Sequence, residues 1–506
     1  MPRTPEQAYA ELAGRLKQTT LLESCVSVLG WDEQTYMPPG GAAHRANQLS
    51  LLAGLCHERA TAPEIGQLLS EIEGTPLVAE PDSPIAANVR EARRDYDRAT
   101  KLPRRLVEEL SHTATLSQQA WIGARKQSDF NQFRPWLEKI VALKREEAQA
   151  IGYGKGVPYD ALLDAFEPGM TAADVTRLFT PLRDELVKLN AAIAASGRRP
   201  NRDIIERRYP VDAQRQFSLA VAEKIGFNFD EGRLDVAAHP FCSGFGPGDV
   251  RLTTRYDEHH FPGAFFGTLH EAGHGMYEQG LERAAFGLPV GAACSLGIHE
   301  SQSRMWENFV GRSRSFWDHF YPQAQQTFPE ALSATASGDF YWAVNDVQPS
   351  FIRVEADEAT YNLHILLRFD LERPLIAGDL QPADVPAAWN ETFTKYFGMT
   401  PPDDARGCLQ DIHWSSGGIG YFPTYALGNM YAAQFFVAAS RDLGDLPAAF
   451  ARGEFAPLKT WLTEKIHRRG KQYRAQKLVQ IVTGQSLSPD SLVRHLHQKF
   501  DELYGL

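Results

Sequence analysis

The sequence predicts a mainly α-helical fold. A capping box, Thr4-Pro-Glu-Gln7, opens a segment in which apolar residues recur every three or four positions. Residues 106–152 repeat this helical spacing, with a break predicted between positions 129 and 135. The chain ends in the same way, because apolar residues follow Ser488-Pro489 at intervals of four, at Leu492, Leu496, Phe500 and Tyr504.

Strand-like alternation is rare, and its clearest example is residues 249–256. There Val250, Leu252 and Thr254 would face one side of a strand, and the arginines and Thr253 the other. Turns rich in glycine and proline flank this segment. We therefore expect one short strand element within a helical protein.

Length, charge and cysteine content limit the number of domains, the partners and the location that the sequence allows. At about 150 residues per domain, 506 residues allow three domains without requiring them, and residues 196–212 are interpreted as a surface loop rather than a linker. The net charge of −11 disfavours nucleic acid and anionic membranes as partners. No apolar stretch reaches the roughly 20 residues of a membrane span, and no secretory signal is visible. Five single cysteines without a C-x-x-C pair favour a reducing, cytoplasmic location.

The segment with the clearest chemistry is residues 261–280, where Pro262 suits a first helical turn and Gly280 the position after the last. It contains His270-Glu-Ala-Gly-His274, an H-E-x-x-H pattern that chance would produce only about 0.03 times in such a chain. On a helix the two histidines lie one turn apart, so their imidazoles can share one tetrahedral metal ion. Glu271 points too far round to be a ligand, yet it can reach a water that the metal activates.

A catalytic zinc site of this type requires a third protein ligand. Glu300, in His299-Glu-Ser-Gln302, follows on a second segment with helical spacing and would complete the His2Glu set of gluzincin metallopeptidases. The metzincin pattern does not fit, because Gly280 occupies the position of its third histidine. A solvated surface acid is the alternative for Glu300, and the upstream motif disfavours it.

Three glycines, Gly267, Gly273 and Gly275, lie inside the predicted metal-binding helix. Each costs up to about 1 kcal/mol relative to alanine, so intrinsic propensity does not hold this helix. Either the close approach of a neighbouring helix or room for a substrate would explain them, and packing is the commoner reason.

Six motifs occur in an order that is itself distinctive: His239-Pro-Phe241, Asp249-x-Arg251-x-Thr253, His270-Glu-x-x-His274, His299-Glu-Ser-Gln302, Ile352-Arg-x-x-Ala-Asp357 and Gly407-x-x-Gln-Asp-x-His-Trp414. Three more motifs extend the match towards the N-terminus: Trp31-Asp-Glu-Gln-Thr35, Met37-Pro-Pro-Gly40 and Asp160-Ala-Leu-Leu-Asp164. In these motifs the sequence resembles the M32 metallocarboxypeptidases, the carboxypeptidase Taq family, over essentially the whole chain.

The resemblance implies an angiotensin-converting-enzyme/neurolysin-like fold. In that fold two helical lobes surround a deep groove, and a short strand element lies next to the zinc helix. It also implies a single catalytic domain over residues 1–506 and a homodimer. The implied activity is the removal of single C-terminal amino acids from peptides, with broad specificity but not for proline, and with one zinc ion per chain. Cobalt or manganese would also suit a His2Glu site.

The resemblance and the chemistry of the residues together assign roles in catalysis. We expect His270, His274 and Glu300 to bind the metal and Glu271 to act as general base. His413 and a tyrosine, with Tyr421 weakly preferred over Tyr425, are expected to stabilise the oxyanion. A buried structural histidine is the alternative for His413.

The free C-terminal carboxylate of a peptide requires a partner, and a guanidinium binds it with two parallel hydrogen bonds. Arg353 is the best candidate, although it could instead form an ion pair with acids close to it in sequence. His239, Arg251 and Tyr425 are expected to contact the substrate. A further hypothesis is that the strand at residues 249–256 pairs with the substrate backbone as an added strand.

Two other functions remain open from the sequence. An oligoendopeptidase would use the same zinc chemistry to cut peptides internally. A catalytically dead protein that only binds peptides is the second alternative, which the complete set of His270, Glu271, His274 and Glu300 argues against without excluding it.

Overall fold

The computed structural model describes residues 3–506, which divide into two compact units. Unit 1 comprises residues 3–100, Asn201–Val344 and Phe435–Gln485. Unit 2 comprises Lys101–Pro200, Asn345–Gln434 and Ser486–Leu506. Each unit therefore gathers segments that are far apart in the sequence, and one boundary, at residues 200–201, falls in the stretch interpreted as a surface loop.

Helices dominate both units, which confirms the predicted fold class. The helices of unit 1 are α1 (Pro5–Thr35), α2 (Ala42–Ala60), α3 (Pro63–Ile72), α4 (Pro84–Lys101), α9 (Asp203–Glu206), α10 (Val211–Ile225), α11 (Phe261–Gly280), α12 (Leu296–Arg304), α13 (Arg314–Thr327), α14 (Pro329–Leu332), α15 (Ser337–Ala343), α19 (Leu446–Ala451), α20 (Ala456–Lys465) and α21 (Ala475–Thr483). The helices of unit 2 are α5 (Arg104–Gln127), α6 (Phe130–Ile151), α7 (Pro158–Leu163), α8 (Ala172–Ala195), α16 (Tyr361–Ala377), α17 (Val385–Phe397) and α22 (Asp490–Tyr504), and α18 (Pro423–Leu443) begins in unit 2 and ends in unit 1.

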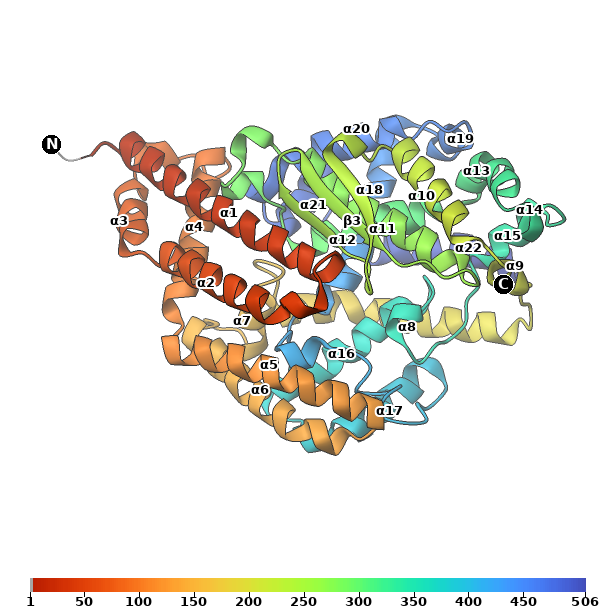
Figure 1. Cartoon of the computed structure of the whole chain (residues 1–506), viewed down its shortest axis with the longest axis horizontal. Coiled ribbons are helices and arrows are strands. Elements are labelled where there is room, and N and C mark those ends of the chain that lie inside the picture. The colour runs from red at the N-terminus through yellow and green to blue at the C-terminus, as the bar shows by residue number, and fades with distance from the viewer. Residues whose placement is uncertain (1–2) are drawn as a thin grey trace. The chain divides into compact units, whose positions relative to one another are not determined.

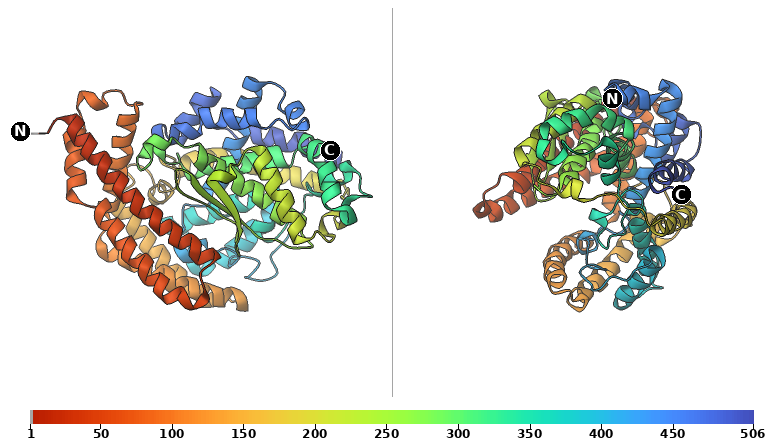
Figure 2. Two further views of the ribbon diagram at one scale, coloured as in Figure 1. Left: turned by 45° about the horizontal axis from the view of Figure 1, so that its top comes forward. Right: turned by 90° about the vertical axis from the view of Figure 1, so that its right-hand side faces the viewer.

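The predicted N-terminal helix begins as its capping box requires. The Thr4 hydroxyl accepts from the backbone N–H of Gln7, and the Gln7 side chain accepts from the backbone N–H of Thr4. Leu12 packs into a core formed with α3 and α4. Figures 1 and 2 show α1 and α2 side by side, joined by a short turn.

The other two predicted helical regions are also confirmed. The break in residues 106–152 falls at Ser128, whose φ of 53° ends α5, while Pro135 lies inside α6. The break therefore comprises Ser128 and Asp129, at the start of the predicted window. In α22 the four residues at intervals of four are all buried.

A three-stranded sheet in unit 1 contains the predicted strand. Its strands are β1 (Gly232–Val236), β2 (Cys242–Gly246) and β3 (Asp249–Thr254), in the order β1-β3-β2. β3 pairs in parallel with β1 and antiparallel with β2, so both of its edges are already hydrogen-bonded. The hypothesis that this strand pairs with a substrate backbone is therefore wrong, because a central strand has no free edge.

Helix α11 lies against this sheet (Figure 1) and holds the predicted metal ligands. Phe261 and Phe265 stack on each other with ring centroids 5.1 Å apart, within a buried aromatic cluster. This burial offsets the low helix propensity of the glycines. Gly280 is the last residue of the helix rather than the one after it. A Cβ there would lie 2.4 Å from the His467 ring, so this position requires glycine.

Two of the three glycines inside α11, Gly273 and Gly275, serve packing, as favoured above. A Cβ at Gly273 would lie 2.5 Å from the carbonyl oxygen of Gln302, so this glycine lets α12 approach the helix. A Cβ at Gly275 would lie 2.6 Å from the ring of Phe227. Gly267 has only ordinary contacts at 3.8 Å and beyond.

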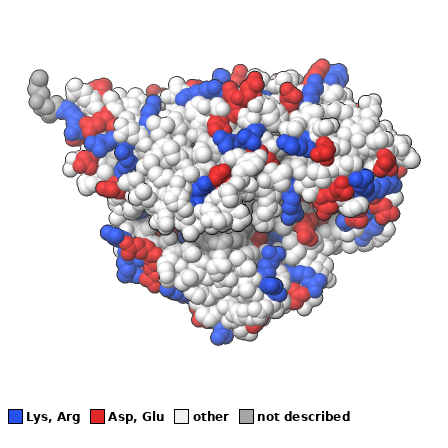
Figure 3. Space-filling view, in the orientation of Figure 1, with Lys and Arg blue, Asp and Glu red and all other residues white. Residues whose placement is uncertain are grey.

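Positive and negative side chains are interspersed over the face of the molecule in Figure 3. Within residues 3–506, no helix combines the length and the apolar character that crossing a bilayer requires.

Candidate metal centre

The predicted metal ligands come together on two crossing helices of unit 1. Gly273 allows α12 to cross α11 closely, and Ser295 caps the start of α12, because its hydroxyl accepts from the backbone N–H of Ile298. His270, His274 and Glu300 thereby place one ligand atom each within 4.8 Å of the others.

The distances between these atoms fit a metal ion. Glu300 Oε2 lies 3.6 Å from His270 Nε2 and 3.4 Å from His274 Nε2. Ligands at about 2.1 Å from a tetrahedral zinc are separated by about 3.4 Å. Both distances from Glu300 are close to this value, and all three atoms lie within 4.8 Å of one another, as a shared zinc-sized cation requires.

The outer nitrogens of both histidines are held by other side chains. His270 Nδ1–H donates to Glu307 Oε2 at 2.8 Å, and Glu307 also accepts from Arg304 at 3.1 Å. His274 Nδ1 lies 2.5 Å from His299 Nδ1. Both imidazoles thus direct Nε2 towards Glu300, with their rings fixed from behind.

Electrostatics keep Glu300 ionised. Burial opposes its ionisation, but Arg304 and the two histidines outweigh burial and hold the pKa of Glu300 well below its usual range. Arg304 Nε donates to Glu300 Oε1 at 2.7 Å, while Oε2 faces the histidines and also accepts from the Ser303 hydroxyl at 3.1 Å. Burial lowers the pKa of His274 to about 3, so its ring is a neutral lone-pair donor at pH 7.

Glu271 has the environment of a general base. It is only 6% exposed, and burial together with the charges of Glu300 and Glu307 raises the pKa of Glu271 to about 7. A base with a pKa near neutrality both accepts and returns a proton readily at physiological pH.

The predicted carboxylate-binding residue lies in a buried cluster of unit 2. Arg353 Nε and Nη2 donate to Asp411, and Nη1 donates to the hydroxyl of Tyr361. Arg368 Nε donates to the other oxygen of Asp411 at 2.7 Å. Asp411 thus lies between two guanidiniums, and the ion pair weighed for Arg353 exists with a residue distant in sequence rather than with its neighbours.

Positive charge prevails in this cluster. Burial opposes ionisation of Asp411, but Arg368 and Arg353 hold the pKa of Asp411 far below its usual range. One carboxylate therefore faces two permanent cations. Arg353 keeps two N–H bonds without an acceptor among residues 3–506, so it can still donate to an anion.

His413 and both candidate tyrosines border the same cluster. The Tyr425 hydroxyl lies 3.5 Å from His413 Nε2, and the Arg353 guanidinium lies 5.1 Å from the centre of the Tyr425 ring. The Tyr421 ring packs 5.4 Å from the His413 ring. Burial lowers the pKa of His413 to about 4, so its imidazole is neutral at pH 7.

Glu372 fixes the segment that carries His413 and Tyr421. Its carboxylate accepts from Trp414 Nε1 at 2.9 Å and from the backbone N–H of Gly420 at 3.0 Å, each one residue from a candidate. Tyr159 donates to it as well. Gly420 has a φ of 90°, and a Cβ there would lie 2.9 Å from the backbone of α7, so only glycine fits.

The last two predicted substrate contacts lie in unit 1. His239 is exposed after β1. Arg251 is engaged in packing, because it donates twice to Asp249 and its guanidinium lies 4.4 Å from the centre of the Trp31 ring of α1.

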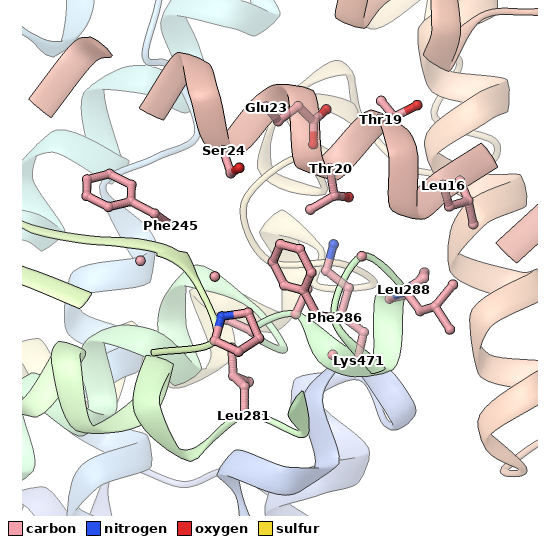
Figure 4. Close-up of a pocket in the computed structure, with 18 of the residues that line it drawn as sticks. Leu16, Thr19, Thr20, Glu23, Ser24, Phe245, Leu281, Phe286, Leu288 and Lys471 are labelled. Carbon is pink, nitrogen blue, oxygen red and sulfur yellow. The ribbon is translucent and has the colours of Figure 1, made fainter. Parts of the chain in front are cut away.

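A pocket of about 490 Å³ opens in unit 1 beyond the end of α11. Figure 4 shows Thr20, Glu23 and Ser24 of α1 on one side and Phe245, Phe286 and Lys471 on the other. Glu278, one turn after His274, also lines this pocket.

Sequence reasoning missed the residues that orient the ligands. His299 stands inside a quoted motif but received no role, and Glu278 and Glu307 lie outside the motifs. In unit 2 the sequence did contain the relevant residues. Gln410 and Asp411 belong to one quoted motif and bind Arg353 of another, but the two motifs were not connected.

Comparisons with known proteins agree over the whole chain. A family model described as Carboxypeptidase Taq (M32) metallopeptidase matches residues 11–500. Thermostable carboxypeptidase 1 of Thermus thermophilus is 47% identical over 99% of this chain and 100% of its own length, and Carboxypeptidase 1 of Bacillus subtilis is 38% identical over 99% of both. The crystal structure of an M32 carboxypeptidase from Deinococcus radiodurans R1 superposes with a TM-score of 0.95 at 40% identity, covering 99% of this chain and 100% of that one.

Proposed function

Because the chain belongs to the carboxypeptidase Taq (M32) family of metallopeptidases and is a metallocarboxypeptidase, we propose that it uses one zinc ion to release single C-terminal amino acids. His270, His274 and Glu300 would hold the ion. The spacing of their three lone-pair donors is the observation that carries this proposal. Cobalt and manganese suit the same ligands, so metal analysis has to identify the native ion.

When bound, a divalent metal supplies Lewis acidity, which acidifies water and polarises a carbonyl group. Glu271 takes the proton of the attacking water and passes it to the leaving amine. Its burial and its pKa of about 7 suit both transfers.

The proposal assigns the remaining roles to residues of unit 2 and to two residues of unit 1. His413 and Tyr421 donate to the oxyanion, with Tyr425 as the alternative donor and as a substrate contact. Arg353 binds the terminal carboxylate, supported by its two remaining N–H bonds and the second guanidinium of Arg368. His239 and Arg251 complete the proposed substrate contacts.

The carboxylate site favours removal of terminal residues over internal cleavage. An internal peptide bond presents no anion to Arg353, so a buried guanidinium there would lack its partner. The proposed specificity is broad, with poor action on C-terminal proline.

The proposal also covers the domain organisation, oligomeric state, location and partners of the protein. We propose a single catalytic domain over residues 1–506, in keeping with the match over residues 11–500, and a homodimer. A cytoplasmic location is proposed because Cys25, Cys56, Cys242, Cys294 and Cys408 are all free thiols. Peptides are the proposed partners, and the net charge of −11 disfavours nucleic acid and anionic membranes.

Mass spectrometry of a mixed peptide set tests the reaction. The wild type should produce ladders of C-terminally shortened peptides, and Glu271→Gln should produce none while still binding zinc. Ladders from Glu271→Gln would remove the residue from the role of base. C-terminally amidated copies of the peptides should resist the enzyme, whereas an oligoendopeptidase would cut them as readily as free acids.

A further inference from the structure

A chain of hydrogen bonds runs from the wall of the pocket to a metal ligand. Glu278 Oε1 lies 2.7 Å from His299 Nε2, and His299 Nδ1 lies 2.5 Å from His274 Nδ1. Glu278 and His274 both belong to α11, one turn apart, and His299 of α12 bridges them.

The positions of the protons along this chain follow from the groups involved. A carboxylate only accepts, so the His299 Nε2 that faces Glu278 carries a proton and donates it. With its proton on Nε2, the His299 ring has a lone pair on Nδ1, and this nitrogen faces His274 Nδ1. His274 therefore has its proton on Nδ1, and its Nε2 presents a lone pair towards Glu300.

The reverse arrangement would be incompatible with metal binding. If His299 donated from Nδ1, His274 Nδ1 would have to accept, and the proton of a neutral His274 would lie on Nε2. A protonated Nε2 has no lone pair for a metal ion. The orientation of the two hydrogen bonds thus decides whether His274 is ready to act as a ligand.

Packing holds the chain in place. The His299 ring lies 4.6 Å from the His274 ring and 5.1 Å from the Tyr277 ring, measured between centroids. β2 passes close to Glu278, since a Cβ at Gly244 would lie 2.6 Å from Glu278 Oε2. A larger residue at Gly244 would displace the carboxylate from His299.

The two histidine ligands are therefore oriented by different devices. His270 donates directly to a carboxylate, that of Glu307. His274 Nδ1 is linked to a carboxylate only indirectly, because the imidazole of His299 lies between it and Glu278. The longer chain places its anionic end at the pocket, whereas Glu307 is held by Arg304.

We propose that Glu278 and His299 are positioning residues for the metal site, because they fix the proton of His274 on Nδ1 and so present Nε2 to the metal ion. This inference rests on the proposed ligand set of His270, His274 and Glu300. It assigns His299 no contact with the metal or the substrate.

Competition with a chromophoric chelator for Zn²⁺ measures the effect directly. His299→Phe keeps an aromatic ring but removes the acceptor, and we expect Zn²⁺ affinity to fall about 10- to 100-fold. His299→Asn places an amide oxygen near the position of Nδ1, so it should recover most of the affinity. In Glu278→Gln the amide oxygen can still accept from His299, but the side chain is uncharged and its NH2 group can also donate. We therefore expect Zn²⁺ affinity to fall up to about tenfold.

Matched controls separate positioning from folding. Glu282→Gln alters an exposed carboxylate of the same region that caps a short turn, and it should bind Zn²⁺ as the wild type does. Thermal unfolding of the metal-free variants reports on the fold independently of the metal. Equal Zn²⁺ affinity in His299→Phe and wild type would overturn the inference, as would loss in His299→Asn as large as in His299→Phe.

Failure of the metal site itself has a different signature. Wild-type protein that does not bind one Zn²⁺ per chain would contradict the ligand set, and with it the inference. Wild-type binding at one ion per chain, without a response in His299→Phe, would leave the ligand set standing and overturn only the role of His299.

Discussion

Two carboxylates, each held between basic side chains, show how similar surroundings can build opposite sites. In unit 1, Glu300 faces two imidazole nitrogens that offer lone pairs. In unit 2, Asp411 faces two guanidiniums that offer N–H bonds and carry permanent charge. Converging lone pairs require a cation, while converging N–H donors with excess positive charge suit an anion.

A third cluster shows what happens when the charges balance. Glu358 in unit 2 accepts from Lys499 at 2.5 Å and from His495 at 2.8 Å, and all three are largely buried. Burial lowers the pKa of His495, so this cluster holds one anion and one cation. Such a pair is complete by itself, and we expect it to stabilise the fold without binding a ligand.

The largest expected effect comes from neutralising the first carboxylate. Glu300→Gln removes an anionic ligand, and Zn²⁺ affinity should fall about 100-fold or more, because about four ligands share roughly 10–16 kcal/mol in zinc sites. Turnover should be lost with it. Chelator competition and peptide hydrolysis measure both, and near wild-type affinity would exclude Glu300 as a ligand.

The matching change in unit 2 should act on stability. Asp411→Asn leaves two buried guanidiniums without their counter-charge, which costs about 3–5 kcal/mol of unfolding free energy. Urea unfolding measures this loss. Zn²⁺ affinity should stay within about twofold of wild type, and a large fall in affinity at unchanged stability would contradict the separation of the two roles.

Arg353→Lys tests the anion site. Lysine keeps the charge but cannot form two parallel hydrogen bonds, and losing a buried charged partner costs about 2–5 kcal/mol, so kcat/KM for free-acid peptides should fall about 100-fold. Arg373→Lys, which alters an ion pair with Asp370 on α16, is the matched control. If amidated and free-acid peptides lose activity equally in Arg353→Lys, the arginine does not bind the terminal carboxylate.

Site residues that are positioned by local helix geometry could be predicted from the sequence, whereas those positioned by packing between helices could not. His270 and His274 are related by one helical turn, so their convergence follows from local geometry and was predictable. Helices with caps and regular apolar spacing were predictable for the same reason. Glu307 and His299 reach the ligands only because α12 and the π-helix Met305–Gly311 pack on α11, and no local pattern encodes that packing.

The strand at residues 249–256 shows that a correctly predicted element can still be placed wrongly in the fold. Its alternation predicted β3 correctly, but its place in the sheet depends on β1 and β2, which contain Gly232, Gly244 and Gly246 and show little alternation. An edge strand and a central strand therefore looked the same in sequence. The role of Asp411 could not be predicted either, because its ion pairs with Arg353 and Arg368 join residues that are far apart in the sequence.

The balanced cluster predicts a pH dependence of stability. Burial opposes ionisation of Glu358, but Lys499 and His495 lower the pKa of Glu358 from 4.5 to about 2. Its contribution of about 3 kcal/mol is therefore present above about pH 5 and is lost as the pH falls towards 2. Glu358→Gln should flatten this part of the stability profile in urea unfolding. A profile that stays as steep in the variant would assign the acid sensitivity to other carboxyls.

The smallest effect is expected at His239, because an exposed side chain contributes one hydrogen bond at most to a flexible peptide. Such a bond is worth about 0.5–1.5 kcal/mol, so His239→Ala should raise KM about two- to tenfold with kcat and unfolding temperature unchanged. His259→Ala, at another exposed histidine, is the control. An unchanged KM would remove His239 from the substrate contacts. A fall in kcat/KM as large as that in Arg353→Lys would show that peptide recognition depends on more than the excess of positive charge around Asp411, and would weaken the contrast between a cation site and an anion site.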